Sequence, residues 1–259
     1  MKKGKFIVLE GITCTGKSTL AKMLVDDLNN HAVPAIFNHE PTKLLFGAIV
    51  RAIAEKHPIS PVAFEKAKER IAFFADRKGG LSKFDARLLS VVNKLSYYGD
   101  ILYGRAAMPT YEDMQILFIA DRREDLLLNV IPKIGQGINI IQDRYEMSTF
   151  AFGMATDVSR EKIAAWHAEA LKNIYVKPDA VFYIDIPPRE ALERLEKSGK
   201  IIDIYEEKLE RLQKIRENYL YLLDTKRFQG AVIVDGRRKL EEVFDDVKLL
   251  AKDVIGKTG

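Results

Sequence analysis

The feature that most constrains this chain is a glycine-rich segment directly after a short apolar run, Phe6-Ile7-Val8-Leu9. The segment, residues 11–19, reads Gly-Ile-Thr-Cys-Thr-Gly-Lys-Ser-Thr. It fits the pattern G-x-x-x-x-G-K-[ST], a loop between a buried strand and a helix. Glycines at Gly11 and Gly16 let the backbone approach an anion closely, and the amide groups of the loop and of the helix N-terminus face that anion. The chain is therefore predicted to bind a nucleoside triphosphate.

Individual residues of this loop have distinct expected roles. Lys17 can reach the β- and γ-phosphates of ATP, and the Ser18 hydroxyl can ligate Mg²⁺. Cys14 is the only cysteine, and two interpretations of it stay open, a small loop filler or a reactive thiol near a helix N-terminus. The residues expected to surround the triphosphate are Gly11, Thr13, Cys14, Thr15, Gly16, Lys17, Ser18 and Thr19.

Length and composition limit the class of protein. The 259 residues suffice for one α/β domain with an insertion or for two small domains. A single cysteine excludes an internal disulfide and fits a reducing cytoplasm. The net charge of +4 suits a polyanionic small substrate, and no basic stretch is interleaved with aromatic residues. No apolar stretch is long enough for a signal peptide or a membrane span. We expect a cytoplasmic protein that binds neither nucleic acid nor membranes.

Apolar runs alternate with helical periodicity along the chain. Strands are predicted at residues 5–10, 33–38, 138–142, 180–185 and 231–235. Helices are predicted at residues 18–30, 113–134, 159–175, 188–197, 206–225 and 240–253. This alternation predicts an α/β fold of the P-loop NTPase type, a parallel five-stranded sheet with helices on both faces. Ligands are expected beyond the carboxyl ends of the strands.

Two segments interrupt the alternation. Residues 57–109 have helical patterns but no clear strand, and they are interpreted as a helical insertion of open function. Residues 197–205 are short and polar and contain Gly199, which favours a mobile lid between two helices. We therefore expect one kinase-type domain over residues 1–259, with this insertion and this lid.

Charged residues follow the predicted strands at positions where ligands bind. Asp143 can hold Mg²⁺ or orient an attacking group, and the adjacent Arg144 can grip a phosphate with two hydrogen bonds. Glu40 begins a Glu-Pro-Thr turn after the second strand, with Arg51 further along. A surface ion pair and a solvated turn are the alternative interpretations of these charges.

An aromatic residue and an arginine four positions apart share one face of a helix, where they can stack on a flat base and hydrogen-bond it. Phe118 and Arg122 have this spacing, and Phe73 and Arg77 repeat it within a similar segment. A core phenylalanine beside a surface arginine is the alternative for either pair.

Taken in order, these motifs resemble those of thymidylate kinases, which move the γ-phosphoryl group of ATP onto dTMP. The resemblance covers most of the chain outside residues 57–109. It rests on the phosphate loop after Glu10, on Glu40-Pro41-Thr42 with Gly47 and Arg51, on Leu117-Phe118-Ile119-Ala120-Asp121-Arg122, on Asp143-Arg144-Tyr145 with Ser148, and on Asp185-Ile186-Pro187-Pro188 followed by Ala191-Leu192-Glu193-Arg194.

The resemblance implies a role for each matching residue. Lys17 and Ser18 would serve ATP and Mg²⁺, and Asp143 would act near the metal and the acceptor phosphate. Arg237 would lie near the adenine, and the lid lysines Lys197 and Lys200 would neutralise the transferred group. Arg51 and Arg144 would grip the acceptor phosphate, and Glu40 is also expected at the acceptor. Phe118 would stack on the thymine and Arg122 would hydrogen-bond it, and Thr149 and Phe152 would lie near the base and sugar. The resemblance also implies a homodimer.

Three departures from the family pattern bear on specificity. Thr13 stands where the family usually has an acidic residue that contacts the acceptor's sugar. The lid carries lysines, and Ile204 occupies a position where many members have arginine. The ammonium group of a lysine would therefore act where many members use the planar guanidinium of an arginine. The pair at Phe73 and the pair at Phe118 compete for the base, and we favour the second because Arg122-Arg123-Glu124 continues the family pattern better.

The predicted function is therefore Mg²⁺-assisted, in-line transfer from ATP to a nucleoside monophosphate, with dTMP as the first candidate. A kinase for another acceptor, such as dUMP or a nucleoside, is the alternative that Thr13 and the insertion motivate. A non-catalytic ATP-binding module, with the insertion as a partner surface, is the alternative from another class.

Overall fold

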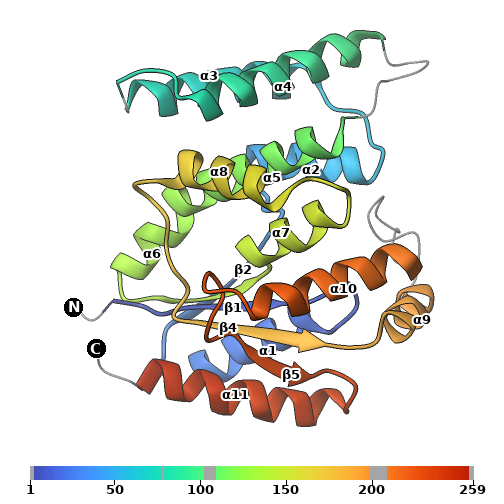
Figure 1. The fold of residues 1–259 in the computed structure, drawn as a ribbon. Coiled ribbons are helices and arrows are strands. Elements are labelled where there is room, and N and C mark those ends of the chain that lie inside the picture. Colours follow the sequence, from blue (N-terminus) through green and yellow to red (C-terminus); the bar gives the residue numbers. More distant parts are fainter. Residues whose placement is uncertain (1–2, 78, 102–108, 199–208, 257–259) are drawn as a thin grey trace.

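A computed structural model describes residues 3–77, 79–101, 109–198 and 209–256, and Figure 1 shows its fold. Five parallel strands form one sheet in the order β2-β3-β1-β4-β5. The strands are β1 (Phe6–Glu10), β2 (Ala35–His39), β3 (Asn139–Asp143), β4 (Ala180–Asp185) and β5 (Val232–Asp235). The predicted P-loop NTPase-type α/β fold is confirmed, and each strand begins and ends within two residues of its predicted bounds.

The central strand β1 sets the position of the phosphate loop. All five of its residues are buried, because β3 and β4 flank it and helices cover both faces. The register pairs Leu9 with Asp143 of β3 and with Phe182 of β4. Since parallel strands end at a common edge, the loop after β1, Glu40 after β2 and Asp143 of β3 come together there.

Helices cover both faces of the sheet (Figure 1). α1 (Lys17–Asn30) and α11 (Leu240–Gly256) pack on one face over an apolar cluster that includes Leu24 and Val247. The larger cluster, on the other face, lies beneath α2 (Leu45–Ala54), α5 (Tyr111–Asp125), α7 (Glu146–Met154), α8 (Arg160–Leu171) and α10 (Leu209–Leu223). α9 (Pro188–Ser198) follows β4. Within the described ranges, no helix has the length and apolar character needed to cross a bilayer.

The helices differ from prediction in two ways. The single helix predicted at 113–134 is divided into α5, a π-helical stretch η1 (Leu126–Val130) and α6 (Ile131–Gly135). The helical spacing of apolar residues continues through the π-helical stretch, so the sequence does not reveal it. The one local sign is Pro132, which has no N–H to donate and lies just after η1. The second difference is that α2 and α7 are not predicted as helices. Both are short and largely apolar, so neither shows the polar face that marks a helix in a sequence.

The segment at 57–109 forms two helices, α3 (Pro61–Asp76) and α4 (Lys83–Ile101), which lie as an outer layer over α2, α5 and α8 (Figure 1). Apolar residues of both helices join the larger core cluster. At the α4–α8 junction, the Arg87 guanidinium lies 5.4 Å from the ring centroid of buried Trp166. The backbone N–H of Phe84 also donates to Glu169 of α8 at 2.7 Å. The two helices are therefore packed onto the rest of the domain and share its core.

A buried ion pair holds this outer layer to α5. Arg123 of α5 lies 2.5 Å from Asp85 of α4, and both side chains are fully buried. The rings of Phe74 and Phe84 lie 4.8 and 5.2 Å from the same guanidinium. Burial opposes ionisation of Asp85, but Arg123 and the hydrogen bonds from Ser82 hold the pKa of that carboxyl below its ordinary value. Asp85 is therefore ionised at neutral pH.

Asp85→Ala should lower the free energy of unfolding by about 3 to 5 kcal/mol, because it leaves the Arg123 charge buried without its partner. Urea denaturation of the purified protein measures this difference. Glu65→Ala, which breaks the exposed Glu65–Lys68 pair, is the matched control and should change stability by less than about 1 kcal/mol. Equal effects of the two substitutions would contradict the assignment.

Candidate active site

The phosphate loop connects β1 to α1, and its conformation requires glycine at two positions. Gly11 has φ 148° and Gly16 has φ 90°, in the region that L side chains rarely adopt. A Cβ on Gly11 would also lie 2.6 Å from the Ile184 carbonyl oxygen. The glycines of the motif therefore serve both backbone conformation and the close approach of β4.

Lys17 is the buried cation of this loop. Its Nζ donates to the Ile12 carbonyl at 2.5 Å and to the Thr15 hydroxyl at 3.1 Å. The ammonium is thereby held among loop atoms, and a phosphate bound in the loop would compete with these two oxygens for it. This arrangement is consistent with the predicted triphosphate site.

Ser18 and Asp143 form a site that fits Mg²⁺. The Ser18 hydroxyl donates to Asp143 Oδ2, which joins the start of α1 to the end of β3. Asp143 Oδ1 is buried and has no hydrogen-bond partner among the described residues, so this oxygen can ligate a cation. A hydroxyl and a carboxylate oxygen are hard ligands of the kind Mg²⁺ takes. Across the described ranges no three His, Cys, Asp or Glu residues gather around one point, so phosphate oxygens and water would complete the coordination.

Arg144 lies beside the phosphate loop in a constrained backbone conformation. Its φ of 66° is unusual for a residue with a side chain. Its Nη1 donates to the Gly11 carbonyl at 2.9 Å and approaches the hydroxyls of Ser148 and Tyr219 at 3.3 and 3.4 Å. Phe152 packs against the guanidinium at 4.8 Å. The arginine is therefore held at the edge of the sheet where an acceptor phosphate is expected.

A buried carboxylate organises the groups around Arg144. Glu10 is fully buried at the end of β1, and burial raises its pKa. It accepts hydrogen bonds from the Ser148 hydroxyl at 2.5 Å, from the Tyr219 hydroxyl at 3.0 Å and from the backbone N–H of Tyr145 at 2.9 Å. These contacts tie α7 and α10 to the phosphate loop. Tyr219 is not predicted as a site residue, because a tyrosine in an amphipathic helix gives no sign of a polar partner 209 residues away.

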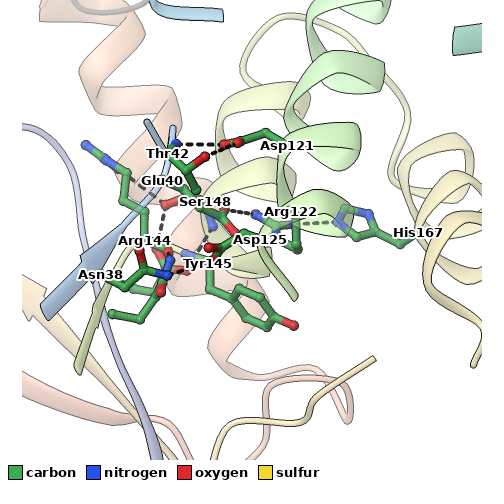
Figure 2. Close-up of polar contacts among 12 residues, drawn as sticks. Asn38, Glu40, Thr42, Asp121, Arg122, Asp125, Arg144, Tyr145, Ser148 and His167 are labelled. Carbon is green, nitrogen blue, oxygen red and sulfur yellow. Dashed lines mark hydrogen bonds and ion pairs between the residues drawn. The ribbon is translucent and has the colours of Figure 1, made fainter. Parts of the chain in front are cut away.

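Glu40 and Arg122 form a buried pair that Figure 2 shows. The guanidinium bonds both carboxylate oxygens of Glu40, with Nε at 2.9 Å from Oε1. Its Nη1 lies 2.6 Å from His167 Nε2, and the ring of Tyr145 lies 4.7 Å away. Burial lowers the pKa of His167 to about 3, so the imidazole is neutral and accepts from Arg122. Burial alone would lower the pKa of Arg122, but the contact with Glu40 outweighs it and raises that pKa above its ordinary value.

Arg122 thus lies inside the wall of the site. These contacts use three of its five N–H donors, and two are left for the base contact that the resemblance implies. The alternative of a surface arginine is excluded, since Arg122 is 1% exposed.

The Glu40-Pro41-Thr42 turn is held from both sides. Asp121 accepts from the Thr42 backbone N–H at 2.8 Å and from its hydroxyl at 2.5 Å (Figure 2). Arg51 donates to the carbonyl oxygens of Pro41, at 2.8 Å, and Thr42. The predicted acceptor-phosphate arginine therefore lies at this turn, close to the edge that carries Asp143.

The other predicted acceptor residues lie on α5 and α7. Phe118 is partly buried on the face of α5 that carries Arg122. Thr149 is buried on α7, and Phe152 is partly buried. The competing pair lies elsewhere, because Phe73 is 45% exposed on α3 with Arg77 over its ring at 4.4 Å. α3 belongs to the outer layer (Figure 1), away from the carboxyl edge of the sheet.

On the nucleotide-donor side, the predicted cations lie at the surface. Arg237 is exposed after β5 and pairs with Asp235 through two contacts of 2.8 and 2.7 Å. Lys197 is exposed at the end of α9, and the rest of the predicted lid at 197–205, from Gly199 on and including Lys200, lies outside the described residues. An open groove of about 530 Å³ lies beside α9. It is lined by Pro187, Arg189, Glu190, Glu193, Arg194 and Lys197.

Two further arginines come to this side of the site without being predicted as site residues. Arg194 donates to the Cys14 carbonyl at 3.3 Å and to the Gly236 carbonyl at 2.9 Å. Arg216 of α10 pairs with Asp185 through two contacts of 2.8 Å. Both lie on helices with many charged residues. Their positions in the sequence do not distinguish them from neighbouring charged residues that face solvent. For Arg216, the position of its partner Asp185 at a strand end is the one indication in the sequence of a site nearby.

Asp121→Asn should become more stable relative to the wild type as the pH rises from about 5 to about 8. Burial raises the pKa of Asp121 from 3.8 to about 7. Between these values the folded state keeps a proton that the unfolded state releases, so the wild type's free energy of unfolding falls as the pH rises. Asparagine has no such proton. Urea denaturation of both proteins across this range tests the difference, and a pH-independent difference would contradict it.

Comparisons with known proteins agree with this geometry. A family model described as thymidylate kinase matches residues 98–247. The probable thymidylate kinase of Methanosarcina mazei is 30% identical over 244 residues, which cover 93% of this chain and 92% of that protein. The probable thymidylate kinase of Thermococcus kodakarensis is 28% identical, covering 97% of this chain and 98% of the relative. The thymidylate kinase of Carboxydothermus hydrogenoformans is 27% identical, with coverages of 95% and 96%.

These alignments span nearly the whole of both chains and so include the α3–α4 layer. The family match, the phosphate loop and the parallel sheet all describe one kind of enzyme. The chain belongs to the thymidylate kinase family and is a nucleoside monophosphate kinase.

Proposed function

We propose that this enzyme transfers the γ-phosphoryl group of ATP to the 5′-phosphate of dTMP, giving ADP and dTDP. The observation that carries the proposal is the junction of Ser18 and Asp143 at the phosphate loop, with Arg144 beside it and Arg51 across the same edge. Phosphoryl transfer depends on positioning and on charge neutralisation more than on covalent chemistry. This edge of the sheet offers both.

Mg²⁺ fits the site through the Ser18 hydroxyl and the unpartnered Asp143 Oδ1. When bound, it would neutralise charge on the β- and γ-phosphate oxygens. Side chains of the protein would bind and align the two phosphates. Lys17 binds the transferred phosphate, and Arg144 and Arg51 hold the acceptor phosphate, so the two reacting groups are kept in line. In this proposal Lys197 and Lys200 supply further positive charge from the lid.

The acceptor's nucleoside would lie between α5 and α7. Phe118 would stack on the base and Arg122 would donate to it, with Thr149 and Phe152 beside the base and sugar. Glu40 acts through Arg122, whose guanidinium it fixes. Thr13 of the phosphate loop is 8% exposed, and its hydroxyl has a weak contact with Cys14 Sγ at 3.7 Å among the described residues, so this hydroxyl would serve the sugar as a neutral hydrogen-bonding group.

The test of the proposed function is ADP release with Mg²⁺ and ATP against dTMP, dUMP, dCMP, UMP and thymidine. Turnover highest with dTMP supports the proposal. Higher turnover with another acceptor would mean that the pocket around Thr13 selects a different nucleotide. Tight ATP binding without turnover on any acceptor would contradict an enzymatic role.

Lys17→Ala should lower kcat by about 100-fold or more, because it removes a cation aimed at the charge that develops on the transferred group. The fold should survive, which the thermal unfolding midpoint checks. Lys22→Ala, at an exposed lysine of the same helix, is the matched control and should keep its kcat. A Lys17→Ala protein with most of its activity would remove Lys17 from the mechanism.

Family membership also supports a homodimer and a cytoplasmic location for this chain. Both remain predictions from the resemblance and from the single cysteine.

A further inference from the structure

One buried side chain close to the predicted acceptor residues has no hydrogen-bond partner in the part of the chain that the structure describes. Gln115 of α5 is 0% exposed, and neither its Oε1 nor its Nε2 meets a partner among the described residues. Burying an amide without partners is costly, and most buried polar groups are satisfied. The unmet donor and acceptor of Gln115 therefore point to a ligand that supplies the missing contacts.

Gln115 lies on the part of α5 that faces the acceptor site. Phe118 and Arg122 follow it by three and seven positions, so the three side chains share one helix face. The amide reaches α7, because a Cβ on Gly153 would lie 3.1 Å from Gln115 Cδ and 3.3 Å from its Oε1. Gly153 follows Phe152 directly and lies one turn after Thr149. The amide therefore lies where the residues expected at the base converge.

The chemistry of a carboxamide complements the Watson–Crick edge of a pyrimidine. It presents an acceptor and a donor side by side. Thymine and uracil present an N3–H donor next to the O4 acceptor, which is the complementary pattern. Cytosine would require the amide to rotate by half a turn, since its N3 accepts and its N4 amino group donates.

We propose that Gln115 reads the Watson–Crick edge of the acceptor base, with Oε1 accepting from N3–H and Nε2 donating to O4. This inference rests on the proposed function and names the group that pairs with N3–H and O4 of the base. Gly153 makes room for the amide, because a side chain there would meet Gln115 and also Ile163, whose Cδ1 lies 2.6 Å from the Cβ position.

The test compares Gln115→Leu with the wild type on dTMP, dUMP, dCMP and 3-methyl-dTMP, which lacks the N3 proton. We expect the variant's KM for dTMP to rise about 10- to 100-fold, as for loss of one or two buried hydrogen bonds, with the KM for ATP unchanged. The wild type should reject 3-methyl-dTMP, and the variant should treat it about as well as dTMP. Gln213→Leu, at an exposed glutamine of α10, is the control and should match the wild type.

The stability of the variants distinguishes a contact between Gln115 and the base from a purely structural role of Gln115. Because leucine removes an unpartnered amide, Gln115→Leu should unfold at the same urea concentration as the wild type or a higher one. Gly153→Ala should reproduce the rise in KM through the displaced amide. An unchanged preference for dTMP over 3-methyl-dTMP in Gln115→Leu would overturn the inference and leave the proposed function standing. A wild type that phosphorylates other acceptors but not dTMP would overturn the proposed function, and the inference with it.

Discussion

Five consecutive charged residues of α5 are each no more than 2% exposed, namely Asp121-Arg122-Arg123-Glu124-Asp125. Much of the structure depends on the hydrogen bonds and ion pairs that these buried side chains form. Each finds partners in a different direction. Asp121 holds the turn after β2, Arg122 pairs with Glu40, and Arg123 pairs with Asp85 of the outer layer. Glu124 accepts from the Phe46 backbone N–H and Asp125 from Asn38. One stretch of α5 thereby joins β2, α2 and α4.

This stretch links stability to the acceptor side of the site. The Glu40 turn and the side of α5 on which we propose that the base binds take their positions from the same buried charges that anchor α4. Since a buried charge must keep its partner, these parts cannot shift independently without leaving one uncompensated. The proposed acceptor site is thus built on an element held by several buried contacts, which suits a reaction whose rate depends on alignment.

The sequence predicts the parts of the molecule whose signal is local. All five strands are apolar runs, and the phosphate loop has a fixed spacing of residues. The strands and the loop can therefore be recognised without knowledge of the fold. The charged block on α5 is not, because a run of five charges normally marks a solvated surface, and the partners of Arg122 and Arg123 lie 82 and 38 residues away. The choice between Phe118 and Phe73 likewise depends on topology, which places α5 beside the site and α3 in the outer layer. Gln115 gives no signal in the sequence, since its burial and the lack of a partner for its amide among the described residues are evident only in the structure.

The contact between Arg87 and Trp166 has a spectroscopic consequence. Trp166 is the only tryptophan in the chain, and it is buried at the junction where α4 meets α8. The tryptophan emission of the protein therefore originates from the interface between the outer helical layer and the rest of the domain. Separation of that layer would expose the indole to water and remove the guanidinium from its face, so the native protein carries a built-in optical probe of this one interface.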